Sequence, residues 1–231
     1  MPAGRNCLTC VVRETDCFCS LPTDALVELQ AVGRHVRFVA GEIVLNEGFA
    51  AERVYVVCRG RIKLTASSPE GRLLLLRIAG PGDVLGLAAA MKGTSHKVSA
   101  EALETCEVKA IGRVEFLEFM ERFREVSRNT VKSVVSEYEG ALLSARRLAL
   151  SSSAAGKLAS VLLDWGRMGS SAGEAMTFRM PLTHDELGSM AGLSRETVTR
   201  LLARFRREDL VEQEGDQMVV REPEKLERLY C

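Results

Sequence analysis

Four of the seven cysteines lie within the first 19 residues, at Cys7, Cys10, Cys17 and Cys19. Cysteine thiolates bind zinc and iron, and closely spaced thiols also undergo redox exchange. In a reducing compartment, this clustering indicates metal ligation or thiol redox chemistry rather than structural disulfides. A fifth cysteine, Cys106, lies in the segment LETCEVKAI. Cys58, in VYVVCRG, alternates with apolar residues and is therefore predicted to be part of core packing.

A second group of chemically informative residues lies in LTHDELGSMAGLSRETVTRLLARFRRE, near the C-terminus. Thr183 with Glu186 three residues later predicts a capping box at the start of one helix. Gly192 predicts a sharp turn, and Ser194 predicts the N-cap of a second helix that ends near Arg207. This is the helix-turn-helix pattern, in which the second helix enters the major groove of DNA.

The exposed face of that second helix is expected to contact DNA. The candidate contact residues are Ser194, Arg195, Glu196, Thr199, Arg200 and Arg204. Arginine donates two hydrogen bonds to guanine, and a carboxylate accepts one from cytosine. Between Ser194 and Arg207, five arginines stand against the single acid Glu196, although the 31 basic and 31 acidic residues of the whole chain cancel. The zero net charge therefore does not exclude DNA as a partner.

The elements that position these residues follow from the apolar patterning. A length of 231 residues favours two modules with separate cores. Residues 20 to about 112 show short, glycine-punctuated strands typical of an antiparallel sandwich or barrel, preceded by a short helix over 22–33. From Arg113 the period becomes helical, with a short helix and then a long one over 124–149. A further helix beginning at 154 opens the C-terminal module.

The long helix carries apolar residues at alternating steps of four and three, which is the seam of a left-handed coiled coil. These residues are Val131, Val135, Tyr138, Leu142, Ala145 and Ala149. The seam predicts a homodimer. The alternative is that this face packs against its own domain.

Several classes of protein are not expected. No apolar run approaches the length needed to cross a bilayer, and the N-terminus lacks the apolar core of a signal peptide, so we expect a cytoplasmic protein with no membrane partner. The Cys7–Cys10 pair leaves open a thiol oxidoreductase as an alternative. Such a CxxC motif should open a helix within a βαβ unit, whereas this one lies in a short polar tail. We therefore predict no enzyme activity and no catalytic residues.

The segments SRETVTRLLARF, VYVVCRGRIKL and IAGPGDVLG resemble the CRP/FNR family of transcription regulators, and the likeness covers nearly the whole chain. The resemblance implies an α+β fold with an N-terminal cyclic-nucleotide-binding-type antiparallel β-roll, a long dimerisation helix and a C-terminal winged helix-turn-helix. The implied parts are a cysteine-rich segment at 1–19, a sensory roll at 20–123, a dimerisation helix at 124–149 and a DNA-binding domain at 150–231. The wing is the hairpin around EQEGDQMVV.

The resemblance also implies the partners. A homodimer would bind a palindromic operator in double-stranded DNA, and RNA polymerase is the expected protein partner. Arg195, Glu196 and Arg200 match the base-reading positions of the family, which implies a half-site with a TGTGA-like or TTGA-like core.

Members that bind cyclic AMP have a Gly-Glu pair after a GDVLG-like segment and an Arg-Ser pair further on. Here Leu87 follows Gly86, and residues 87–100 contain no acid and no arginine. Only His96 and Lys97 are left to contact a phosphate. Cyclic-nucleotide sensing is therefore not expected.

The iron–sulfur sensors of the family carry three closely spaced thiolates ahead of the roll and a fourth on a roll strand. They hold a [4Fe-4S] cluster whose loss in oxygen weakens the dimer. By this resemblance the expected ligands are Cys7, Cys10, Cys19 and Cys106, with Cys17 as the substitute. The spacing departs from the family pattern, because Cys10 and Cys19 are further apart and Cys106 comes early on its strand.

The expected function is thus a DNA-binding transcription regulator controlled by a cluster that responds to redox state, oxygen or NO. Three alternatives stay open for the cysteines. They are a zinc site at Cys7, Cys10, Cys17 and Cys19, a direct thiol switch, or no site at all. A small ligand in the roll is a further alternative for the control of the same regulator.

Overall fold

The structure is a computed structural model that describes residues 6–14, 17–71, 73–150, 153–169 and 175–231. Two compact units are present, the first made of 1–71 and 76–140 and the second of 72–75 and 141–231. Among the described residues, no helix has both the length and the apolar character that a membrane span requires.

The first unit contains two four-stranded sheets with the orders β1-β8-β3-β6 and β2-β7-β4-β5. The strands are β1 (Arg34–Phe38), β2 (Ile43–Leu45), β3 (Arg53–Arg59), β4 (Ile62–Ser67), β5 (Leu73–Ala79), β6 (Val84–Leu85), β7 (Ser99–Ala102) and β8 (Cys106–Gly112). The pairings of β3 with β8 and of β4 with β7 are antiparallel. The antiparallel roll predicted from the sequence is therefore confirmed.

Strands β3 and β8 present their two faces to two different apolar clusters, because successive side chains of a strand point to opposite faces. Val54, Val56 and Ile111 belong to the cluster that also contains side chains of α1 (Thr23–Val32). Val57 and Val108 belong to the other cluster, between the sheets of the roll. A shift of one residue along either strand therefore moves a side chain from one cluster to the other.

The N-terminal segment packs onto the first of these clusters instead of forming the polar tail predicted from the sequence. It forms two short 3-10 turns, η1 (Cys7–Thr9) and η2 (Val11–Glu14), and η1 contacts α1. Cys7, Leu8 and Cys19 pack against buried residues of the cluster. Burial of these side chains ties the segment to the roll.

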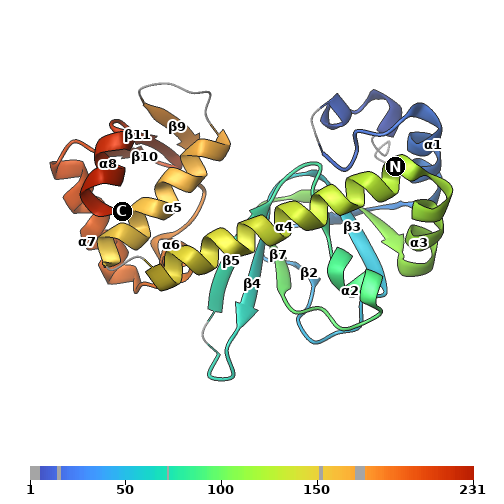
Figure 1. Cartoon of the computed structure of the whole chain (residues 1–231), viewed down its shortest axis with the longest axis horizontal. Coiled ribbons are helices and arrows are strands. Elements are labelled where there is room, and N and C mark those ends of the chain that lie inside the picture. Colours follow the sequence, from blue (N-terminus) through green and yellow to red (C-terminus); the bar gives the residue numbers. More distant parts are fainter. Residues whose placement is uncertain (1–5, 15–16, 72, 151–152, 170–174) are drawn as a thin grey trace. The chain divides into compact units, whose positions relative to one another are not determined.

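The remaining helices of the first unit are α2 (Leu87–Lys92) and α3 (Arg113–Arg122). The latter is the short helix predicted to follow the strands, whereas α2 and β6 were not predicted. The long helix α4 (Arg124–Leu150) follows directly and is continuous across the division between the two units (Figure 1).

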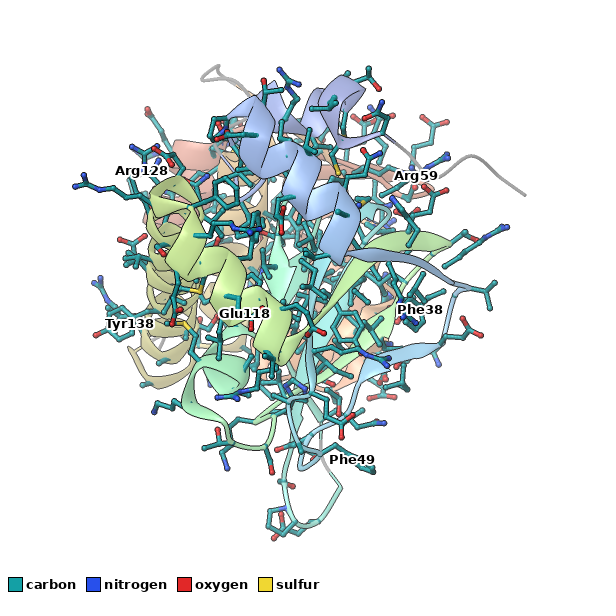
Figure 2. All side chains as sticks on the ribbon, turned by 90° about the vertical axis from the view of Figure 1, so that its right-hand side faces the viewer. Phe38, Phe49, Arg59, Glu118, Arg128 and Tyr138 are labelled. Atoms are coloured by element: carbon teal, nitrogen blue, oxygen red, sulfur yellow. The ribbon has the colours of Figure 1, made fainter. Side chains whose placement is uncertain are left out.

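The predicted seam of α4 is exposed on the single chain. Val131 is 57% exposed, Val135 48%, Tyr138 67% and Leu142 47%, and Tyr138 projects away from the helix in Figure 2. Ala145 and Ala149 are exposed as well. An exposed apolar row of this length is more than scattered surface residues and indicates an interaction face.

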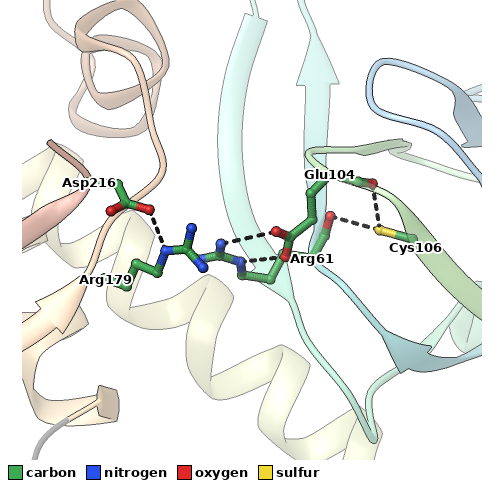
Figure 3. Close-up of polar contacts among 5 residues, drawn as sticks. All are labelled: Arg61, Glu104, Cys106, Arg179 and Asp216. Atoms are coloured by element: carbon green, nitrogen blue, oxygen red, sulfur yellow. Dashed lines mark hydrogen bonds and ion pairs between the residues drawn. The ribbon is translucent and has the colours of Figure 1, made fainter.

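In its described residues, the second unit contains the end of α4, four further helices and one sheet of order β10-β11-β9. Its elements are α5 (Ala154–Gly169), β9 (Met176–Arg179), α6 (His184–Ala191), α7 (Arg195–Arg207), β10 (Val211–Glu214), β11 (Gln217–Val220) and α8 (Pro223–Tyr230). The β10–β11 hairpin lies where the wing was predicted. Asp216 lies in the turn of this hairpin and forms an ion pair with Arg179 (Figure 3). This ion pair ties β9 to the tip of the hairpin.

Candidate functional site

Helices α6 and α7 begin with the caps predicted from the sequence. The Glu186 backbone N–H donates to Thr183 Oγ1 (3.2 Å), and the Thr183 N–H donates to the Glu186 carboxylate (3.0 Å), which completes the capping box. Gly192 ends α6 with a φ of +66°, a conformation that glycine adopts without steric cost. Ser194 Oγ then accepts the Thr197 N–H (3.3 Å) and caps α7.

Helix α7 is sharply amphipathic. Its apolar side chains Val198, Leu201, Leu202 and Phe205 are buried. All six candidate DNA-contacting residues, Ser194, Arg195, Glu196, Thr199, Arg200 and Arg204, are exposed. The buried stripe at helical spacing fixes which face looks outward, so the candidates share a single accessible surface.

The polar contacts along α7 differ between its two ends. Near the N-terminus, the pKa of Glu196 is lowered by its own backbone N–H and by Ser194, so this carboxylate is ionised at neutral pH. Near the C-terminus, Arg204 Nε donates to Glu208 (2.9 Å), and its guanidinium lies 5.2 Å from the centroid of the Tyr230 ring. Arg204 is thus held within its own unit.

Thr199 also has partners within the unit, since its hydroxyl donates to the Arg195 carbonyl (3.0 Å) and lies 2.8 Å from His184 Nδ1. The half of α7 nearest its N-terminus consequently presents two exposed guanidinium groups, Arg195 and Arg200, around a carboxylate. This set can donate to guanine and accept from cytosine at base edges in a major groove.

A second site lies in the first unit, where four cysteines line one cavity. Cys7 and Cys10 come from the N-terminal turns, Cys19 from the segment before α1, and Cys58 from β3. The cavity is small, at about 20 Å³, which is room for a single water molecule. The backbone N–H of Cys7 donates to Gln30 Oε1 (3.0 Å), which ties the first turn to α1.

Cys58 is the residue that sequence reasoning missed. It was predicted to be core packing, but it is half-buried and faces the cavity. The β3–β8 register shifts between Val57 and Arg59, so the pairing is irregular at Cys58. It also shares the strand face of Val54 and Val56, the face covered by α1. That shared phase was readable in the sequence.

The structure does not place Cys106 with the other predicted ligands. Cys106 is fully buried, and its Sγ donates to the carbonyl oxygens of Arg61 and Glu104 at 3.2 Å each (Figure 3). It packs with Val108 in the cluster between the sheets, on the face of β8 opposite to Lys109. Strand alternation is the reason, because a side chain three residues from Lys109 must point to the other face.

Cys17, the predicted substitute, is not among the residues that line the cavity. Its Sγ donates to the Val12 carbonyl (3.2 Å). A hydrogen bond with Cys17 and then burial raise the pKa of Cys19. Burial likewise raises the pKa of Cys58 to about 11. Both thiols are therefore protonated near neutral pH, and metal binding there would release protons.

The donor set fits a thiolate-bound metal group in chemistry. Within the described part of the chain, no three Cys, His, Asp or Glu side chains are gathered closely enough for one metal ion. A group bound by all four thiols would therefore require the cavity to widen. One further observation favours an anionic occupant: Lys109 lines the cavity, and its buried Nζ has no hydrogen-bond partner among the described residues.

The positions that bind cyclic AMP in the resembling regulators carry other side chains here. Leu87 is fully buried in the apolar core and offers no carboxylate to a ribose. His96 is buried, and burial lowers its pKa, whereas Lys97 is exposed. The roll therefore retains the fold of such a domain without its acid and arginine.

Comparison with known proteins covers both units. Residues 156–229 match the Crp-like helix-turn-helix domain, and residues 35–123 match the cyclic nucleotide-binding domain. The chain is 28% identical over 211 residues to the nitrogen fixation regulation protein FixK of Bradyrhizobium diazoefficiens, covering 89% of this chain and 86% of that protein.

Two further similarities bear on fold and control. The chain is 26% identical over 212 residues to the CRP-like cAMP-activated global transcriptional regulator of Mycobacterium tuberculosis, covering 91% of this chain and 94% of that protein. The structure of FixK2 from Bradyrhizobium japonicum superposes with a TM-score of 0.76 at 26% identity, covering 87% of this chain and 98% of that one.

The fold and the α6–α7 site, together with these similarities, define a DNA-binding transcription regulator and not an enzyme. The alternative of a thiol oxidoreductase is thereby set aside. The chain belongs to the CRP/FNR family. Membership implies dimer formation as well as DNA binding. The similar proteins include a cAMP-activated regulator, so membership by itself leaves the controlling signal undetermined.

Proposed function

We propose that this chain forms a homodimer that reads a palindromic operator and is controlled by an iron–sulfur cluster at Cys7, Cys10, Cys19 and Cys58. The cluster would respond to redox state, oxygen or NO. The observation that carries this proposal is the single cavity lined by these four thiols. It replaces Cys106 by Cys58 in the ligand set predicted from the sequence.

On the DNA side, Arg195, Glu196 and Arg200 are proposed to read base edges. Ser194, Thr199 and Arg204 are proposed to contact DNA around them. Two copies of α7 in a symmetric dimer require two half-sites about one helical turn apart, hence a palindrome. RNA polymerase is proposed as the partner of the DNA-bound dimer.

On the dimer side, the exposed row from Val131 to Ala145 on α4 is proposed to pair with the same row of a second copy. The spacing suits a two-stranded coiled coil, in which apolar side chains of one helix fill holes of the other. The four-part division of the chain at 19, 123 and 149 is kept as part of the proposal, with α4 joining the sensory and DNA-binding parts.

A cluster at the cysteines would supply a group that is lost or altered on oxidation. The residues of the chain then connect the pocket to α4. Asn129 of α4 is buried and donates through Nδ2 to the carbonyls of Phe18 (3.2 Å) and Ser20 (2.9 Å), the two neighbours of Cys19. Movement of Cys19 would therefore reach α4 two residues before Val131, at the start of the proposed seam.

Anaerobic purification tests the proposal. We expect a brown protein with iron and sulfide in equal amounts, and tight binding to an operator selected from random duplexes that weakens on exposure to air. Binding is measured by fluorescence anisotropy. Stoichiometric zinc without sulfide would replace the cluster by a zinc site, and unchanged DNA binding after the cluster is lost would contradict control by it.

A further inference from the structure

The cysteine cavity contains the buried amino group of Lys109, for which the described residues supply no hydrogen-bond partner. Lys109 lies on β8, where it pairs with Val56 on one side and His35 on the other, and its side chain is 1% exposed. Its Nζ is one of two buried side-chain polar atoms without a hydrogen-bond partner among the described residues. The other is Thr130 Oγ1 on α4.

The chain holds the Lys109 side chain in place instead of letting it reach solvent. A Cβ built on Gly33, the residue that ends α1, would collide with Cγ and Cδ of Lys109. A larger residue at position 33 would therefore force the methylene stem of Lys109 to shift. The stem is packed and the ammonium is left inside, although burying an unpaired charge is costly.

Among the described residues that line this cavity, the thiols are the only acidic groups. The remaining polar residues of the described lining are Arg13, His35 and Lys109, and none of the lining residues described there is a carboxylate. Arg13 is already engaged, because its Nη1 donates to the Leu8 carbonyl (2.5 Å). Within the described lining, deprotonated cysteines, or an anionic group bound by them, are therefore the groups that can neutralise a Lys109 ammonium.

We propose that Lys109 is the charge partner of the thiolate-bound cluster at Cys7, Cys10, Cys19 and Cys58, acting as a positioning residue that stabilises the bound form and favours its reduction. This inference rests on the proposed function. Four thiolates give a bound cluster a net negative charge, and hydrogen bonds and nearby charge set how readily a cluster accepts an electron. The ammonium is already in the cavity where that charge would arise.

The test uses the full chain and the variants Lys109→Met and Lys109→Gln. Both remove the charge, and glutamine keeps a hydrogen-bond donor. Without iron and sulfide, we expect both variants to melt at or above the wild-type temperature, because an unpaired buried charge has been removed. After anaerobic reconstitution, we expect the cluster to be lost to a chelator about tenfold faster.

We also expect the reduction equilibrium of the cluster to fall about tenfold, which for one electron is 59 mV. The control is Thr130→Val, which removes the other unpartnered buried atom and should change neither rate nor equilibrium. A residue with a merely structural role would lower the melting temperature and cluster retention together. The proposed role predicts opposite signs for these two measurements.

The possible outcomes separate the two proposals. If wild type takes up iron and sulfide but both Lys109 variants match it in loss rate and reduction equilibrium, the role of Lys109 is overturned and the cluster stands. If wild type takes up none, both proposals fall. If Lys109→Met does not fold, Lys109→Gln alone decides, and if neither folds, the charge is required for the fold itself and the proposed role is wrong.

Discussion

The α6–α7 site and the cysteine pocket differ in how far apart their residues lie in the sequence. The first occupies one continuous stretch, 183–207, and the hydrogen bonds that cap its two helices join residues three apart in that stretch. The second needs Cys7, Cys19 and Cys58 from three segments, with Lys109 from a fourth. Local hydrogen bonds can fix the former, whereas the latter exists only once the roll has folded. Loss of one cysteine should therefore disable a whole region, while loss of one arginine should weaken a single contact.

The largest expected effect is at Cys58. Cys58→Ser should reduce bound iron and sulfide to background after anaerobic reconstitution, because a hard hydroxyl replaces a soft thiolate donor. Cys106→Ser is the matched control. It should keep the cluster, since Cys106 faces the other side of β8. If the cluster were lost only in Cys106→Ser, Cys106 of β8 and not Cys58 would be the fourth ligand. The proposed pocket would then be wrong.

The next effect lies between the two regions, on α4. Val135→Asp should weaken dimerisation by about 3–5 kcal/mol, since it buries an unpaired charge in the proposed seam. Analytical ultracentrifugation measures the change, and operator binding should fall with it. Ser136→Asp, an exposed neighbour that points away from the seam, should leave the dimer intact. A dimer unaffected by Val135→Asp would place the interface elsewhere.

Within the α6–α7 site, substitution of a base-reading arginine should have a different effect from substitution of an arginine that contacts only phosphates. Arg200→Ala should cost about 1–3 kcal/mol of operator affinity and relax the preference at one base pair, whereas Arg206→Ala should weaken all sequences alike. Anisotropy titrations against single-base variants of the operator distinguish the two. Equal loss of discrimination from both substitutions would mean that the reading face of α7 is wrongly assigned.

The smallest effect concerns pH and belongs to the first region, which has a buried histidine. Burial lowers the pKa of His96 below its ordinary value of 6.5. The unfolded chain then binds more protons as pH falls, so stability present above pH 6.5 is lost progressively below it. Calorimetry between about pH 5 and 7.5 should show this loss for wild type and a flatter profile for His96→Gln. Equal slopes would show that His96 does not contribute.

Much of the fold was predictable because its signals are local. Thr183, Glu186, Gly192 and Ser194 encode the start and end of two helices within a few residues, and the helical period assigns α7 its exposed face. The strands of the roll were predictable from glycine-punctuated apolar runs. The packing of the N-terminal turns on α1 was not, because Leu8 and Cys7 are buried by partners far along the chain.

The composition of the cysteine pocket was predicted in part. The sequence places Cys7, Cys10 and Cys19 near one another, but which strand supplies a fourth thiol depends on which face of that strand meets α1. For β8, counting from Ile111 places Lys109 on that face and Cys106 on the other. For β3, alternation from Val54 and Val56 places Cys58 on that face, but the prediction assigned Cys58 to core packing because apolar residues surround it.

The contact between Gly33 and Lys109 means that a residue that is not a proposed ligand can change the position of Lys109 in the cysteine cavity. Any side chain added at position 33 must push the Lys109 stem aside, and Lys109 lines the same cavity as the four cysteines. The threshold at which such a regulator responds could then drift or be engineered through one residue at the end of a helix. Gly33→Ala is the smallest such change, and under the proposed function it would alter the response through a residue that is not itself a ligand.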